Sequence, residues 1–291
     1  MTIADSKGLG VLADSDSLQA WIGKVESAED RLAPERVQAL HLALGRSEPL
    51  PQPGDALPPL RHWLYFWPLA ARSELGPDGA PATGGLLPPL GRARRMWAGS
   101  RVSFVRRLSI GESVTKRSTI TAVTPKEGRS GPLVFVTIRH EIGDGYGVAL
   151  IDEQDLVFRQ DAGAAARPGV PARTDAELCE RIEVDPVLLF RYSALTYNGH
   201  RIHYDRRYVK EVEGYPGLLV HGPLLATLMA DVAQRARHER AMARFEFRAL
   251  RPVFDSEPFT VCASSRGDAS VELWIADTAG FTATMGSAEF R

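Results

Sequence analysis

A polar stretch between residues 192 and 205 has the side chains needed for acid–base chemistry on a water molecule. Asn198 and His203 lie five residues apart in it, and a bent loop could bring both into one small volume. Histidine is a common general base near neutral pH because its unperturbed pKa is about 6.5. An asparagine amide can hold a water by donating and accepting hydrogen bonds, and Asn198 could instead simply cap or turn the loop. The leading interpretation is a base and a water-binding group on one loop.

A second candidate site is His221-Gly222-Pro223, where a long apolar helix is expected to begin. Proline fits the first helical turn, whose N–H groups have no partner within the helix. The N–H of Gly222 and the positive end of the helix dipole would then favour negative charge on a bound group. We expect His221 to be structural at the start of this helix, with a substrate contact as the alternative.

Both segments resemble motifs of the MaoC-like, or hydratase 2, family. The family pattern is Gly-Asp-x-Asn-Pro-x-His, and this chain has Tyr-Asn-Gly-His-Arg-Ile-His at 197–203. Asn198 takes the place of the family Asp and His203 that of the family His, while His200 and Arg201 replace the intervening Asn and Pro. The chain is similar over most of its length to the branch of type 2 hydroxyacyl-thioester dehydratases and mesaconyl- or itaconyl-CoA hydratases. The matching segments are LPPL (57–60), RRMWAG (94–99), FVTIRHE (135–141) and RYSALT (191–196).

The resemblance implies a hot-dog fold and a hydro-lyase that adds water to, or removes it from, the C2=C3 bond of an enoyl-CoA thioester. His203 would take a proton from a water held with Asn198, and the N–H of Gly222 would hold the thioester oxygen, where enolate charge develops. The leading substrate is a short branched dicarboxylyl-CoA of the mesaconyl- or itaconyl-CoA type. One alternative is a 3-hydroxyacyl-CoA or acyl-carrier-protein dehydratase of fatty acid metabolism. An alternative from another class is a non-catalytic acyl-CoA-binding protein or a thioesterase.

Six arginines between residues 92 and 107 offer positive charge to an anionic substrate. The planar fork of arginine suits both the phosphates of coenzyme A and a distal carboxylate of the acyl chain. Arg94 and Arg95 are the first candidates for such a contact and Arg201 is the next, with a solvated basic face as the alternative. The spacing of His200 and His203 has no carboxylate or thiol cluster beside it. We therefore expect no metal and no cofactor, coenzyme A being part of the substrate.

The elements that would position these residues form two similar series. Helical spacing is expected from Ser17 to Val25 and from Pro34 to Leu44, and alternation predicts four strands between residues 100 and 150. Past a Gly/Ala/Pro-rich segment, a helix follows Asp185, an amphipathic helix covers 222–239, and four strands lie between 244 and 290. A long helix followed by antiparallel strands is typical of a curved sheet wrapped around a helix. We therefore predict an α+β double hot-dog, with residues 1–160 as a degenerate unit with a helical N-terminal extension, 161–174 as linker and 175–291 as the catalytic unit.

Composition and charge exclude several classes of function. With 35 Lys+Arg against 36 Asp+Glu in 291 residues, the chain lacks the broad basic surface of a nucleic-acid-binding protein. Cys179 and Cys262 lie in dissimilar sequence surroundings, so neither a disulfide framework nor a zinc site is expected. No run of 18 apolar residues occurs, and the first ten residues show no signal pattern. We expect a cytoplasmic protein that binds an acyl-CoA, has no membrane partner and forms a homodimer or a higher homo-oligomer.

Overall fold

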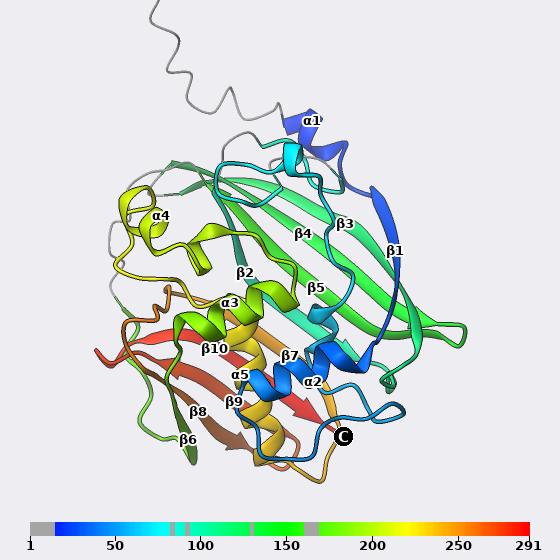
Figure 1. Cartoon of the computed structure of the whole chain (residues 1–291), viewed down its shortest axis with the longest axis vertical. Coiled ribbons are helices and arrows are strands. Elements are labelled where there is room, and N and C mark those ends of the chain that lie inside the picture. Colours follow the sequence, from blue (N-terminus) through cyan, green and yellow to red (C-terminus); the bar gives the residue numbers. More distant parts are fainter. Residues whose placement is uncertain (1–14, 82–84, 91–93, 129–130, 160–168) are drawn as a thin grey trace, which may run out of the picture.

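The computed structural model describes residues 15–81, 85–90, 94–128, 131–159 and 169–291. In this part of the chain ten antiparallel strands form one sheet, in the order β1-β3-β4-β5-β2-β7-β10-β9-β8-β6 (Figure 1). The strands are β1 (Val25–Arg31), β2 (Arg94–Phe104), β3 (Ser113–Gly128), β4 (Gly131–Asp144), β5 (Gly147–Arg159), β6 (Leu178–Ile182), β7 (Met242–Ala249), β8 (Phe259–Arg266), β9 (Ser270–Ala276) and β10 (Thr282–Phe290). The helices are α1 (Ser15–Gln19), α2 (Pro34–Ala43), α3 (Pro186–Leu195), α4 (Arg206–Glu211) and α5 (Gly222–Ala236), with the single turns η1 (Arg61–Leu64), η2 (Arg72–Glu74) and η3 (Arg201–His203). None of the helices described is long and apolar enough to cross a bilayer.

The two halves of the sheet have the same strand order. β1-β3-β4-β5-β2 and β6-β8-β9-β10-β7 follow one pattern, with the first strand of each half at an outer edge. The halves meet where β2 pairs with β7 and Val102 lies opposite Phe245. This repeated strand order confirms the predicted α+β double hot-dog fold. The unit boundaries stay predictions, because residues 160–168 of the expected linker region lie outside the described residues.

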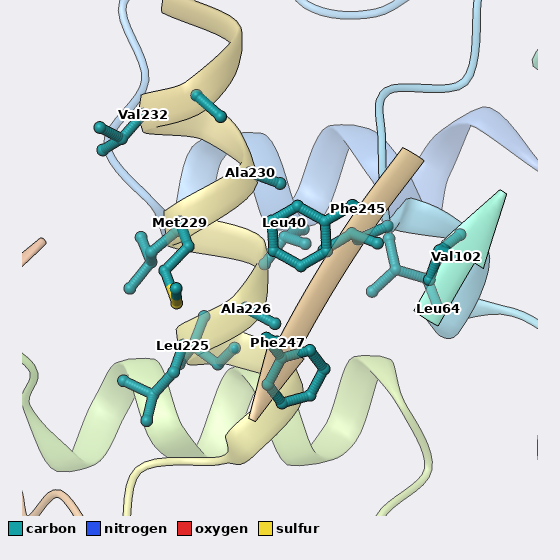
Figure 2. Close-up of a cluster of buried hydrophobic side chains, with 14 of the residues drawn as sticks. Leu40, Leu64, Val102, Leu225, Ala226, Met229, Ala230, Val232, Phe245 and Phe247 are labelled. Atoms are coloured by element: carbon teal, nitrogen blue, oxygen red, sulfur yellow. The ribbon is translucent and has the colours of Figure 1, made fainter. Parts of the chain in front are cut away.

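Helix α5 forms the centre of the hydrophobic core. Its apolar residues recur three and four positions apart, as a helix with one buried face requires, and they are fully or almost fully buried: Leu224, Leu225, Leu228, Met229 and Val232. In Figure 2 this helix lies beside Phe245 and Phe247 of β7, with Leu40, Leu64 and Val102 of the N-terminal half in the same cluster. One core is therefore shared by both halves.

The N-terminal half has no helix as long as α5 among its described residues. Helix α2 and the turn η1 stand between β1 and β2 instead, and Leu40 and Leu64 are their buried apolar residues. Asp152 of β5, which is 1% exposed, accepts a hydrogen bond from Trp63 Nε1 at 2.8 Å, and His62 Nε2 lies 3.3 Å from the same carboxylate. This buried carboxylate fixes η1 to the sheet.

A partly buried ion cluster joins the two halves at α5. Asp231 of α5 lies 2.9 Å from the guanidinium of Arg61 in η1 and 2.8 Å from that of Arg46, which follows α2. Burial opposes ionisation of Asp231, but Arg61 and Arg46 outweigh that effect and hold the pKa of the carboxyl below its usual value. Both arginines belong to the N-terminal half, so the cluster attaches that half to the central helix of the other.

The prediction of a helix from Ser17 to Val25 is wrong beyond Gln19. Helix α1 ends there, and Val25 begins β1, which pairs with β3. Gly23 adopts a φ of +87° and donates a hydrogen bond to Ile120 O at 2.8 Å, so the chain turns onto β3 before a second helical turn can form. The helix expected at 34–44 and the eight expected strands are confirmed.

The two cysteines lie opposite each other, although their sequence surroundings differ. Cys179 of β6 pairs in register with Cys262 of β8, and their Sγ atoms are 2.6 Å apart as free thiols. Strand β6 was not expected, because its residues, Leu-Cys-Glu-Arg-Ile, do not alternate strictly between apolar and polar. The proximity of the cysteines depends on that strand.

Candidate active site

The segment that carries Asn198 and His203 lies between two capped helices. Helix α3 begins after Asp185, whose side chain accepts a hydrogen bond from the N–H of Leu188, and α4 begins after Asp205, which caps the N–H of Tyr208. At the end of α3, Tyr197 adopts a φ of +52° and turns the chain. We call residues 196–205 the Asn198 loop. The capped helices at both ends restrict its conformation.

His203 is held in one tautomer. Its Nδ1 lies 2.8 Å from Leu219 O, and because a carbonyl oxygen only accepts, Nδ1 carries the proton and Nε2 keeps a lone pair. A backbone bond from Leu219 N–H to Ile202 O, at 3.0 Å, holds the same two segments together. The ring is 8% exposed, and burial lowers the pKa of His203 to about 3. His203 is thus a neutral, oriented imidazole with one free basic nitrogen.

The ring of His221 stacks on that of His203. The ring centroids are 3.7 Å apart with an angle of 18° between the planes, and His221 Nε2 lies 2.8 Å from Ser193 Oγ. His221 is fully buried and precedes the first residue of α5. His221 thus contacts both His203 and Ser193 at the start of the helix, and whether it also contacts substrate stays a prediction. Burial keeps the pKa of His221 far below its usual value, which keeps the stacked pair neutral.

Gly222 is the first residue of α5 and follows His221 directly. A Cβ placed on Gly222 would meet no atom within 4 Å, so its backbone borders open space. An N–H group in the first helical turn has no acceptor within the helix, and the helix dipole adds positive potential there. The structure therefore places a potential oxyanion donor one residue from the imidazole that stacks on His203.

Asn198 and His200 are connected through the loop backbone. Asn198 Oδ1 accepts a hydrogen bond from the N–H of His200 at 3.0 Å, so the asparagine turns the loop through its amide oxygen and not through its amide N–H groups. The rings of His200 and His203 meet edge to face, with centroids 5.7 Å apart. The predicted role of Asn198 in holding a water stays a prediction.

Three arginines expected to bind substrate have different surroundings. Arg94 lies 2.9 Å from Glu213, whereas Arg201 is bound to Asp205 at 2.7 Å and to Pro77 O at 3.0 Å. Arg95 has an exposed surface on β2, but burial of part of the side chain lowers the pKa of its guanidinium, which the charge of Asp78 partly offsets. In the described part of the chain no carboxylate lies within ion-pair distance of it. Burial, and then the charges of Arg95 and Arg94, lower the pKa of His200 to about 4, so both arginines lie near the Asn198 loop. Arg95 is the member of the three best able to receive a ligand's charge.

Sequence reasoning did not identify Asp78, a residue of the N-terminal half that lies beside His200. Asp78 Oδ2 lies 3.6 Å from His200 Nε2, and the carbonyl of Asp78 accepts a hydrogen bond from the N–H of Arg201. The only available signal was the Gly- and Pro-rich composition of residues 76–91, which marks a long loop but does not indicate what it contacts. Among the described residues no three His, Cys, Asp or Glu side chains gather as a metal site would require.

Several solved structures share this architecture. HtdX of Mycobacterium tuberculosis matches with a TM-score of 0.65 and 17% identity, over 90% of this chain and 98% of its own. A MaoC-like dehydratase from Phytophthora capsici matches with a TM-score of 0.63 and 13% identity, over 95% and 98%. A further Mycobacterium tuberculosis structure, described as a double hot-dog fold, reaches 0.57 at 16% identity, over 93% and 96%. The protein has the double hot-dog fold of the MaoC-like proteins.

The family model for hydroxyacyl-thioester dehydratase type 2 matches residues 60–255, and the chain belongs to this family. It is 41% identical over 277 residues to the mesaconyl-C(4)-CoA hydratase of Chloroflexus aurantiacus, covering 93% of this chain and 96% of that protein. It is 29% identical over 245 residues to the mitochondrial hydroxyacyl-thioester dehydratase type 2 of Schizosaccharomyces pombe, covering 76% and 80%. The expected family and the hydratase–dehydratase class of enzyme are both confirmed.

Because several histidines have a pKa lowered by burial, we expect the protein to lose stability in mild acid. Burial lowers the pKa of His203 to about 3, and lowers those of His200 and His140 to about 4. The unfolded chain therefore binds more protons than the folded one between about pH 4 and 6.5, so stability is complete above that window and falls as pH decreases through it. We expect the Tm to fall between about pH 7 and pH 5.

Variants at two histidines test that cause. His140→Gln should reduce the fall in Tm, whereas His238→Gln should not, because the side chain of His238 is 80% exposed. A wild-type Tm that is constant across this range would contradict the expectation.

Proposed function

We propose that this enzyme hydrates a short branched dicarboxylyl-CoA thioester of the mesaconyl- or itaconyl-CoA type. The observation that supports the chemistry is the orientation of His203, whose Nδ1 donates to Leu219 O and leaves Nε2 as a base. Similarity to the Chloroflexus aurantiacus mesaconyl-C(4)-CoA hydratase supports the acyl group.

In the proposed reaction, Nε2 of His203 takes a proton from a water that Asn198 helps to hold. The water oxygen bonds to the β carbon, and the electrons of the double bond move onto the thioester oxygen. The N–H of Gly222 stabilises that enolate, an interaction that can lower the barrier by about 2.7–4 kcal/mol. His203 then returns the proton to the α carbon, giving the 3-hydroxyacyl thioester, and dehydration is the reverse.

The low pKa of His203 in the free protein is compatible with this role. A general base works best with a pKa near the working pH, and a value of about 3 makes His203 a weak base before substrate binds. Negative charge that develops on the thioester oxygen favours the imidazolium, because an opposite charge nearby stabilises the charged form. The base therefore becomes stronger as the enolate forms, and at neutral pH it starts fully deprotonated.

The distal carboxylate is assigned to Arg95, which is exposed, near His200 and without an ion-pair partner in the described chain. A hydrogen bond to a charged group contributes about 1.5–3 kcal/mol. Arg95→Gln should therefore lower kcat/KM for mesaconyl-CoA by about 10- to 100-fold and leave kcat/KM for crotonyl-CoA, which lacks the carboxylate, nearly unchanged. Arg101→Gln is the control on the same strand, since Arg101 is already paired with Asp155. Equal losses on both substrates would contradict the assignment.

Incubation with mesaconyl-CoA and with crotonyl-CoA tests the reaction itself. Loss of the enoyl absorbance without release of thiol is expected for a hydratase, and release of free coenzyme A thiol would indicate a thioesterase. No change in either signal would favour an acyl-CoA-binding protein. Faster turnover of crotonyl-CoA or an enoyl-acyl-carrier protein than of mesaconyl-CoA would instead support a dehydratase of fatty acid metabolism.

A further inference from the structure

A tight turn of the N-terminal half lies against the Asn198 loop. The N–H of Gly79 donates to Gly76 O at 2.9 Å with Pro77 between them, which is the arrangement of a β-turn that begins Gly-Pro. Asp78 Oδ1 accepts a hydrogen bond from the N–H of Ala80, and the N–H of Gly76 donates to Ala80 O at 2.7 Å. We call residues 76–80 the Asp78 turn. Its internal hydrogen bonds and its proline make it a stiff element.

Three polar contacts join the Asp78 turn to the Asn198 loop. The N–H of Arg201 donates to Asp78 O at 2.8 Å, and the guanidinium of Arg201 donates to Pro77 O at 3.0 Å. The Asp78 carboxylate lies 3.6 Å from His200 Nε2. At this distance the contact is electrostatic, and it favours the tautomer of His200 that points an N–H at the carboxylate. The turn therefore contacts both residues between Gly199 and Ile202.

Two facing glycines bring the backbones of the turn and the loop into direct contact. A Cβ on Gly79 would lie 2.2 Å from Gly199 O, and a Cβ on Gly199 would lie 2.6 Å from Gly79 O. Both distances are too short for any side chain, and the nearest atom in each case is a backbone oxygen that cannot rotate away. Gly79 also has a φ of +81°, which favours glycine. The glycines permit an approach that any other residue would prevent.

The Asn198 loop is thus held from two sides. Leu219 O fixes the ring of His203 from one side, and the Asp78 turn holds residues 199–201 from the other. His200 connects the Asp78 turn to His203, because the rings of His200 and His203 pack at right angles. Any shift of residues 199–201 would move His203 relative to Gly222.

We propose that Asp78 and Gly79 are positioning residues of the active site, supplied to the C-terminal half by the N-terminal half. Because Gly79 has no side chain, the backbone of the turn can contact the Asn198 loop directly. Asp78 orients His200, and His200 in turn orients His203. The N-terminal half therefore contributes to the geometry of the base. This inference rests on the proposed function, in which His203 is the base.

Gly79→Ala tests the backbone contact, and Gly54→Ala is its matched control. Gly54 has a φ of +90°, close to that of Gly79, but a Cβ there meets nothing within 4 Å. Both variants should lose thermal stability because the positive φ strains an alanine, and Gly79→Ala should lose more because its Cβ also meets Gly199 O. Only Gly79→Ala should lose kcat, by about 100-fold, because a displacement of about 1 Å at a reacting group can cost that much. KM should stay within about twofold, since the substrate-binding residues are unchanged.

Asp78→Asn tests the carboxylate separately. Asparagine keeps an oxygen for the N–H of Ala80 and so preserves the turn, while it removes the charge that faces His200. We expect kcat to fall about tenfold and Tm to stay unchanged. Tenfold is the lower end of the loss in activity when a metal-bound histidine loses the group that orients it. A kcat equal to wild type in Asp78→Asn, or equal in Gly79→Ala and Gly54→Ala, would overturn the proposal.

The NMR signal of the His203 Nδ1 proton gives a readout without substrate. That proton, bonded to Leu219 O, should be shifted or lost in Gly79→Ala and retained in Gly54→Ala. If the wild-type chain hydrates no enoyl-CoA, the proposed function fails, and the proton signal still decides whether the Asp78 turn positions His203. Unaltered signals in both variants would count against the inference.

Discussion

Replacing His203 is expected to lower kcat by about 10²- to 10⁴-fold, the usual contribution of a positioned general base. His203→Asn is the sharper variant, because its amide nitrogen lies near the place of Nδ1 and can still donate to Leu219 O. It removes Nε2 and with it the proton acceptor. His203→Ala should lose as much activity and also leave a cavity beside the ring of His221.

Steady-state turnover of an enoyl-CoA together with thermal unfolding separates chemistry from folding. His203→Asn should unfold near the wild-type temperature, and His238→Ala, at an exposed histidine, should keep full activity. A His203→Asn protein that retains wild-type kcat would rule out His203 as the base. A protein that fails to fold in both His203 variants would instead assign the residue a structural role.

Asp231→Ala is expected to destabilise the fold by about 3–5 kcal/mol, since it leaves the buried charge of Arg61 without its partner. Arg61 is 7% exposed and lies 2.9 Å from Asp231, while Arg46 keeps a second carboxylate, that of Glu180. The loss should appear in urea unfolding as a lower midpoint with an unchanged slope. Because α5 begins with Gly222, looser packing of this helix should also reduce activity.

Glu211→Ala is the matched control for that variant. Glu211 pairs with Arg207 on the surface of α4, where its side chain is 61% exposed, and such pairs contribute about 0–1 kcal/mol. The stability that Asp231 contributes is present above the ordinary carboxyl pKa and is lost as pH falls through its lowered value. A destabilisation by Asp231→Ala no larger than that of Glu211→Ala would contradict a role in joining the halves.

The strands with clear alternation could be predicted from the sequence, and the two outer ones could not. Val134, Val136 and Ile138 alternate along β4 because one face of that strand is buried. The first strand of each half lies at an edge of the sheet, and β1 (VESAEDR) has no fully buried side chain to produce such a pattern. Edge strands carry little hydrophobic signal, so their pairing is visible only in three dimensions.

The residues of the candidate site also fall into two groups, those with a local sequence pattern and those whose contacts are long-range. The sequence predicted a loop at His203 and a helix start at Gly222, and the structure has both there, while their catalytic roles, which came from a family resemblance, stay predictions. Asp78 was missed because its contact with His200 joins residues more than 100 positions apart. Substrate binding by Arg201 stays a prediction, and the sequence did not show that its guanidinium contacts Asp205 and Pro77 within the fold. A local sequence pattern shows which residues could take part in a reaction. It does not show which charged side chains already have ion-pair partners within the fold.

The pairing of β2 with β7 within one chain also determines how the site responds to dilution. Two separate hot-dog subunits would associate by mass action, and their shared site would be lost as protein concentration fell. Covalent connection replaces that equilibrium with a constant effective concentration of one half around the other. The contact of the Asp78 turn with the Asn198 loop, and of Arg61 with Asp231, is therefore independent of how much enzyme the cell makes.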